Sequence, residues 1–144
     1  MVESANAGVV RRVHELFNQL STDSEARRGS REETELLQLF DEQIEFVQPV
    51  GQIDSSVYHG RDELRQSWDE WLDIWREHRV EIEQLAERGS DVLALSRSLF
   101  VGRDGLRVEQ RGGSIFGFRD GKIVRFEAFF EQDEARQAFE RGSD

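Results

Sequence analysis

The stretch FGFRDGKIVRFEAFFEQDEARQAF, residues 116–139, predicts two β-strands joined by a tight turn and followed by a short helix. Apolar residues recur at every second position on both sides of Arg-Asp-Gly, which is typical of an antiparallel hairpin. In the second strand, one face carries Val124, Phe126, Ala128 and Phe130. The segment from Gln132 to Glu140 then places its apolar residues on one side, as a short helix does.

Further elements are predicted on the N-terminal side of this hairpin. Four runs alternate with a period of two and predict an antiparallel meander over Val80–Leu85, Asp91–Val101, Leu106–Phe118 and Lys122–Phe130. Before them the pattern predicts a helix from Val9 to Leu20, a short helix from Glu32 to Phe40, a strand from Ile44 to Pro49 and a long helix from Gly60 to about His78. This order predicts an α+β fold in which N-terminal helices and one long helix cover a cone-shaped, curved antiparallel sheet. We expect one domain over residues 1–144, with an ordered core over about 9–140.

The composition argues against several classes of partner. The chain has 30 acidic and 19 basic residues, and its formal charge of -11 would repel nucleic acid and anionic membranes. It has no apolar run of about 20 residues and no secretory signal pattern at its start, so we expect a cytoplasmic protein with no membrane partner. Cysteine is absent, the three histidines have no regular ligand spacing, and no phosphate-binding loop is present. We therefore predict no metal site and no cofactor.

The order of elements, together with VYHGRDELRQSWDEW at 57–71, the hairpin at 116–139 and FVQPVG at 46–51, resembles the nuclear transport factor 2-like superfamily. Within it, the chain is most similar to the SnoaL-like polyketide cyclase and ketosteroid isomerase branch. The resemblance implies a conical pocket that is lined by the concave face of the sheet and closed by the long helix. It does not fix the function, because this fold carries several chemistries and some proteins without any.

The carboxylates that such enzymes use do not recur here. The resemblance aligns the aspartate base of the steroid isomerases with Gln48, whose amide cannot accept and return a proton. Their oxyanion donors align with Val13 and Ser114, and the aspartate of the SnoaL-like cyclases also aligns near Ser114. For limonene-epoxide hydrolases, an arginine is retained at Arg97, but the two aspartates align with Leu99 and Ala128.

Arg97 is the most informative candidate in the sequence. It lies in LALSRSLFV, residues 93–101, where alternation places it on the same face as four apolar side chains. We predict that this face lines the pocket and that Arg97 binds a carboxylate, enolate or carbonyl oxygen of a small ligand. The alternative is a purely structural ion pair with Glu109, Glu127 or Asp41.

Other candidates complete the predicted site. His14 is a possible general base, with a satisfied core histidine as the alternative. The three tryptophans at helical spacing are either core or pocket wall, and an exposed loop pair is the alternative for the two residues that precede Gly60. The predicted ligand-binding residues are Gln48, Tyr58, His59, Trp71, Trp75, Gln110, Ser114, Phe116 and Phe126.

Two functions are therefore open. The first is an isomerase, cyclase or hydratase that acts on an apolar, oxygen-bearing substrate through Arg97 and His14. The second is a module that binds a small molecule in the same cavity without turnover. We also expect a homodimer formed through the outer face of the sheet, with Ile115 and Phe129 at its centre and Arg–Glu pairs around them.

Overall fold

The computed structural model describes residues 3–48 and 57–142. The helices are α1 (Ala5–Gln19), α2 (Ser24–Arg27), α3 (Arg31–Gln38), α4 (Gly60–Leu72) and α5 (Gln132–Arg141). The strands are β1 (Phe40–Val47), β2 (Val57–His59), β3 (Trp75–Arg88), β4 (Asp91–Gly102), β5 (Arg107–Arg119) and β6 (Lys122–Phe129). The expected end of a strand at Pro49 lies outside the described residues.

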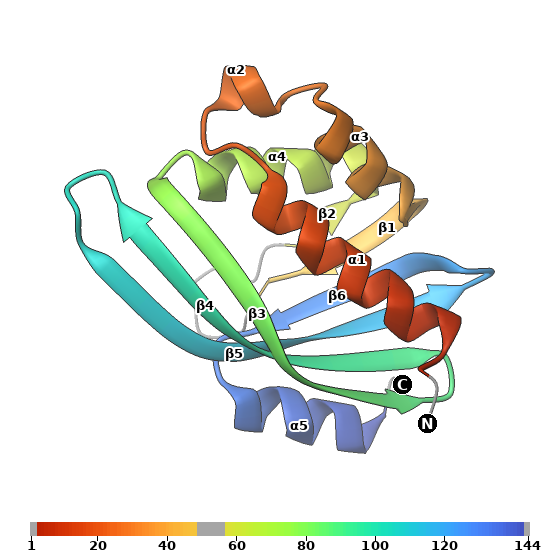
Figure 1. The fold of residues 1–144 in the computed structure, drawn as a ribbon. Coiled ribbons are helices and arrows are strands. Elements are labelled where there is room, and N and C mark those ends of the chain that lie inside the picture. Colours follow the sequence, from red (N-terminus) through yellow and green to blue (C-terminus); the bar gives the residue numbers. More distant parts are fainter. Residues whose placement is uncertain (1–2, 49–56, 143–144) are drawn as a thin grey trace.

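The six strands form one curved sheet in the order β2-β1-β6-β5-β4-β3. The meander from β3 to β6 is antiparallel, as predicted, but β1 pairs with β6 in parallel, so the sheet is mixed and not wholly antiparallel. Figure 1 shows α1, α3 and α4 on the concave side of the sheet and α5 on its convex side. The concave face and its covering helices therefore enclose the main core.

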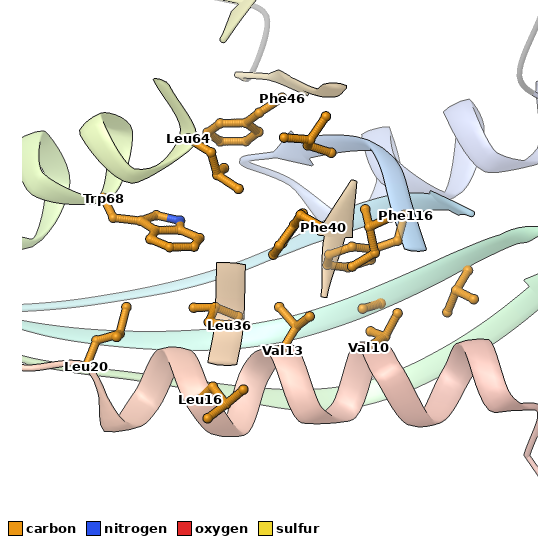
Figure 2. Packing of buried hydrophobic residues seen from close by; sticks show 14 of the residues in the cluster. Val10, Val13, Leu16, Leu20, Leu36, Phe40, Phe46, Leu64, Trp68 and Phe116 are labelled. Carbon is orange, nitrogen blue, oxygen red and sulfur yellow. The ribbon is translucent and has the colours of Figure 1, made fainter. Parts of the chain in front are cut away.

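Helix α1 covers the concave face with one apolar stripe. The Ser4 side chain accepts a hydrogen bond from the Ala7 amide and so caps the helix at its N-terminus. The stripe repeats at intervals of three and four residues, and its buried members are Ala7, Val10, Val13, Leu16 and the following Leu20. In Figure 2, Val10 and Val13 point from α1 toward the rings of Phe116 and Phe40.

The predicted long helix is shorter in the structure. Helix α4 ends at Leu72, and Trp75 and His78 lie in β3, where they pair with Gly102 and Phe100 of β4. The spacing of the tryptophans matches a helix, but pairing with β4 along the whole of β3 satisfies the backbone hydrogen bonds of this segment. Trp75 therefore belongs to the sheet and not to the helix.

A second, smaller core lies between α5 and the convex face. Leu93, Leu95 and Ala135 are buried there, and Ile115 and Phe129 pack against them. A methyl group on Gly113 would lie 2.9 Å from the Ala135 side chain, so α5 lies directly on the backbone of β5. Because α5 covers part of Ile115 and Phe129, these two side chains already have contacts within one chain, and the dimer stays a prediction.

The loop after α1 is anchored to α4 by a buried arginine. The charged stretch from Ser21 to Glu33 predicts a solvated surface, but Arg27 within it is 0% exposed. Its Nη2 atom lies 2.7 Å from Asp69 Oδ1 and 3.0 Å from Asp73 Oδ1, and its Nη1 atom donates to the Ser21 carbonyl. These bonds fix α2 against α4.

No helix within residues 3–48 and 57–142 has the length and apolar character needed to cross a bilayer.

Candidate functional site

A cavity of about 200 Å³ lies between the concave face of the sheet, α1 and α4, and we call it the His14 chamber. Most of its wall is apolar and aromatic, including Val13, Phe17, Leu36, Phe40, Trp68, Trp71, Phe100, Phe116, Phe126 and Phe129. Its polar side chains are His14, Ser96, Ser98, Gln110 and Ser114. Ligand sites are commonly built this way, with an apolar wall and a few polar groups that orient the guest.

A second cavity of about 240 Å³ adjoins the first, and we call it the Gln48 chamber. Its polar side chains are Gln48 and Ser67, and the Ser67 hydroxyl already donates to the Leu64 carbonyl. The residues that line both chambers are Phe17, Trp68, Trp71, Phe126, Ala128 and Phe129. The two chambers therefore share a wall formed by the rings of Phe17, Trp68, Trp71 and Phe126 and by Ala128, whereas the Phe129 side chain packs on the convex face.

His14 enters the first chamber from α1. Its Nδ1 atom lies 2.8 Å from the Val10 carbonyl oxygen, which can only accept, so Nδ1 carries the proton and Nε2 carries the lone pair of the neutral ring. Burial lowers the pKa of His14, and the hydrogen bond to Val10 and the nearby Arg11 act with smaller effects in opposite directions. The ring therefore faces the cavity as a neutral imidazole near pH 7.

The other polar groups of this chamber come from β4 and β5. Ser98 and Gln110 are directly opposite each other in the antiparallel register, and Ser114 is opposite Ala94 on the same face. The Gln110 Nε2 atom donates to the Phe130 carbonyl at 3.3 Å. We call Ser96, Ser98 and Ser114 the serine strip. Their hydroxyls can both donate and accept hydrogen bonds, so the serine strip suits a carbonyl or hydroxyl oxygen.

Four stacked rings form a ladder across β2, β1, β6 and β5. Tyr58, Phe46, Phe126 and Phe116 are cross-strand partners in the register of the sheet. The ring centroids of Phe46 and Phe126 are 4.6 Å apart, and those of Phe126 and Phe116 are 4.8 Å apart with an interplanar angle of 7°. Because the rings face one another along the sheet, they present their edges to the cavity.

Gln48 is held in place by a short chain of hydrogen bonds. The Tyr58 hydroxyl donates to Glu70 at 3.1 Å, and its oxygen accepts from Gln48 Nε2 at 3.4 Å. Burial, followed by the hydrogen bond to Glu70, raises the pKa of Tyr58, so the phenol keeps its proton. Tyr58 does not line either chamber in the described part of the chain, and it contacts the site only through its hydrogen bond with Gln48.

The prediction that Arg97 lines the pocket is wrong. Its side chain is 50% exposed on the convex face, where Nη2 lies 3.2 Å from Glu81 Oε2 and Nη1 lies 3.6 Å from Glu109 Oε1. The neighbouring Ser98 faces the cavity instead, so alternation turns Arg97 outward. Leu93 and Leu95, on the same face as Arg97, pack against α5 and do not line the cavity.

Besides Arg97 and Tyr58, two other candidates also lie away from the chambers. His59 is exposed at the start of α4, where its amide donates to Glu63, so it does not contribute to the cavity. Trp75 packs behind the wall, with its ring centroid 5.5 Å from that of Trp71 and 5.1 Å from that of Phe100. The remaining predicted site residues line one or both chambers, namely His14, Gln48, Trp71, Gln110, Ser114, Phe116 and Phe126.

Sequence reasoning missed Ser96 and Ser98, which line the His14 chamber. The sequence contains the signal, because Ser96, Ser98 and Phe100 alternate with the leucines and Arg97. Choosing between these two faces requires the register of β4 against β5.

The chemistry available in the cavity is limited to one titratable group. Among the described lining residues of both chambers, His14 alone changes its charge near neutral pH, and none is a carboxylate. No group of three His, Asp or Glu side chains in the described ranges is arranged to hold a metal ion. The arrangement can accept a proton at His14 Nε2 and can bind an oxygen at the serine strip.

Comparisons with known proteins agree with this architecture. An NTF2-like protein of unknown function from Burkholderia pseudomallei K96243 superposes with a TM-score of 0.75 at 20% identity, covering 94% of this chain and 97% of that one. The protein TerC, co-crystallised with polyporic acid, gives 0.74 at 16% identity, with 95% and 99% covered. A Catenulispora acidiphila DSM 44928 protein with a ketosteroid isomerase-like fold, in complex with trimethylamine, gives 0.65 at 12% identity, with 85% of each chain covered.

These likenesses establish the fold, which is NTF2-like. Among curated proteins, none shows significant sequence similarity to the chain. The family model for the SnoaL-like domain matches residues 7–126, which include the polar residues of both chambers. The chain therefore belongs to the SnoaL-like domain family.

Proposed function

We propose that this protein binds a small, largely apolar, oxygen-bearing molecule in the cavity between the concave face, α1 and α4. The observation that carries the proposal is the composition of the cavity wall, in which aromatic rings surround His14 and the serine strip. An apolar guest would gain about 25 cal/mol for each Å² of surface removed from water, and an oxygen would find donors and acceptors on β4 and β5.

Tryptophan fluorescence tests this proposal directly, because Trp68 and Trp71 line both chambers. Native mass spectrometry of the purified protein should detect a bound small molecule. Titration with neutral aromatic alcohols and ketones should show saturable binding that quenches or shifts the tryptophan fluorescence. Ser98→Val should weaken binding of the same compounds while the melting temperature stays close to that of the wild type. Absence of saturable binding by every compound would contradict the proposal.

A second candidate function is proton transfer within the bound molecule. It is favoured by the tautomer of His14, whose Nε2 atom carries a lone pair in a neutral ring at the cavity wall. Such a base would take a proton from a carbon next to a carbonyl group and return it elsewhere, as an isomerase, cyclase or hydratase requires. The serine strip would stabilise the oxygen of the enol intermediate.

Isotope exchange separates this second function from binding alone. For a ketone that binds, incubation in deuterium oxide with the protein should accelerate deuterium incorporation next to the carbonyl group. His14→Gln should abolish this acceleration and retain binding. Binding without any acceleration would leave the protein as a binding module.

A further inference from the structure

We infer that the natural ligand is an elongated molecule with an apolar middle and a hydroxyl group at each end, bound across both chambers at once. This inference rests on the proposed function and adds to it the shape and the chemical class of the ligand. The observation that carries it is the placement of two side chains with acceptor atoms along one aromatic floor, the row of stacked rings of Phe116, Phe126 and Phe46. His14 lies against Phe116 at one end of this floor, and Gln48 follows Phe46 on β1 at the other end.

The floor is continuous from one chamber to the other. Phe46 lines the Gln48 chamber, Phe126 lines both, and Phe116 lines the His14 chamber, and the three rings stack in register on adjacent strands. Since neighbouring strands are about 4.8 Å apart, the floor from Phe46 to Phe116 is roughly 10 Å long. A ligand that reaches both polar ends therefore needs an apolar middle of about this length.

The room above the floor comes from a small side chain. Ala128 lies on β6 opposite Ser114 and lines both chambers, with the rings of Trp68 and Trp71 also in the shared wall. A larger side chain at this position would extend into the space that the chambers share. The ring edges of the floor are electropositive, so they favour the face of an aromatic group in the ligand.

Each end offers an acceptor atom for a hydroxyl proton. In the His14 chamber, the acceptor is His14 Nε2, because Nδ1 is committed to the Val10 carbonyl. In the Gln48 chamber, the amide nitrogen of Gln48 donates to Tyr58, which leaves its carbonyl oxygen as the acceptor. A hydroxyl group is the neutral oxygen group that donates to such atoms, so the geometry points to one at each end of the ligand.

The test is a matched series of probes titrated against tryptophan fluorescence: biphenyl, 4-hydroxybiphenyl and 4,4′-dihydroxybiphenyl. The dihydroxy compound should bind about tenfold more tightly than the monohydroxy compound, since it forms one additional hydrogen bond with the protein and a single hydrogen bond changes affinity by about this factor. Gln48→Met should remove this gain and leave the affinity for biphenyl within about twofold. Gln84→Met is the matched control, because Gln84 lies on β3 and lines neither chamber.

A second variant tests the span of the ligand independently of Gln48. Ala128→Leu should abolish the tight binding of 4,4′-dihydroxybiphenyl and preserve that of phenol, which fits within one chamber. Equal affinity for the mono- and dihydroxy compounds would overturn this inference and leave the proposed function in place. An Ala128→Leu protein that binds 4,4′-dihydroxybiphenyl as tightly as the wild type would do the same. Failure of every probe, phenol included, would overturn the proposed function as well.

Discussion

Arg97 and Glu81 form an ion pair on the convex face of the sheet, with Nη2 and Oε2 3.2 Å apart on neighbouring strands. Both side chains are substantially exposed, at 50% and 43%. The guanidinium therefore has solvent and two carboxylates to satisfy it and does not depend on a ligand.

Replacing Arg97 should accordingly have little effect. Arg97→Gln is expected to shift the melting temperature by no more than about 2 °C, because exposed ion pairs are weak and screened by salt. Its affinity for aromatic alcohols should equal that of the wild type. Ser98→Val, one residue along but facing the cavity, should weaken the same binding. Loss of binding in Arg97→Gln alone would contradict the placement of this side chain.

The lowered pKa of His14 predicts how stability changes with pH. The folded protein holds a proton on His14 more weakly than the unfolded chain does, whose histidine titrates near 6.5. The contribution of His14 to the free energy of unfolding is therefore complete above pH 6.5. It is lost as the pH drops from 6.5 toward the lower pKa of the folded state. His78 is shifted in the same direction, mainly by burial, and adds to this loss.

Urea unfolding between about pH 7.5 and about pH 5.5 measures this effect. His14→Gln should unfold with a shallower pH dependence than the wild type, and the slope that remains should come from His78. The hydrogen bonds from Arg79 and from Arg111 lower the pKa of Glu81 and of Glu83, respectively, so these two carboxylates keep their charge in this window. An unchanged slope in His14→Gln would show that His14 is not desolvated in the folded state.

Asp69 forms ion pairs with two arginines, of which Arg27 is buried and Arg28 is exposed. Arg27→Met leaves Asp69 without its buried cation and should cost about 3–5 kcal/mol of unfolding free energy. Arg28 also contacts Asp69, but its side chain is 62% exposed. Arg28→Met should therefore cost less than about 1 kcal/mol. Chemical denaturation of both variants makes the comparison, and equal losses would contradict the burial of Arg27.

The contact between β5 and α5 depends on a glycine. In Gly113→Ala, the new methyl group would lie 2.9 Å from the Ala135 side chain and 3.1 Å from the Ala94 carbonyl oxygen. The expected cost is about 1–3 kcal/mol, because either the helix or the strand has to move. Gly8→Ala in α1 is the control, since a methyl group there has no atom within 4 Å and should stabilise the helix by up to about 1 kcal/mol. Destabilisation of both variants to the same degree would refute the close approach.

The sequence by itself determined the class of fold and most of the elements. The alternation on either side of Asp120 and Gly121 fixes a hairpin, because Gly121 and Asp120 both adopt positive φ in its turn. The stripe of α1 has only one face that can be buried, so its orientation follows from its spacing. His14 and Ser114 could be assigned to the cavity for the same reason, since the apolar pattern of α1 and of β5 indicates which face of each element is buried.

Only the tertiary structure decided which face of β4 meets the cavity. Both faces of this strand bury side chains, one against α5 and the other against the main core, so hydrophobicity does not distinguish them. Pairing of Ser98 with Gln110 turns the serines inward and Arg97 outward. Likewise, Trp75 fits a helical spacing, and only its pairing with Gly102 places it in β3. In both cases the deciding interaction joins segments that are distant in sequence, and no local pattern records it.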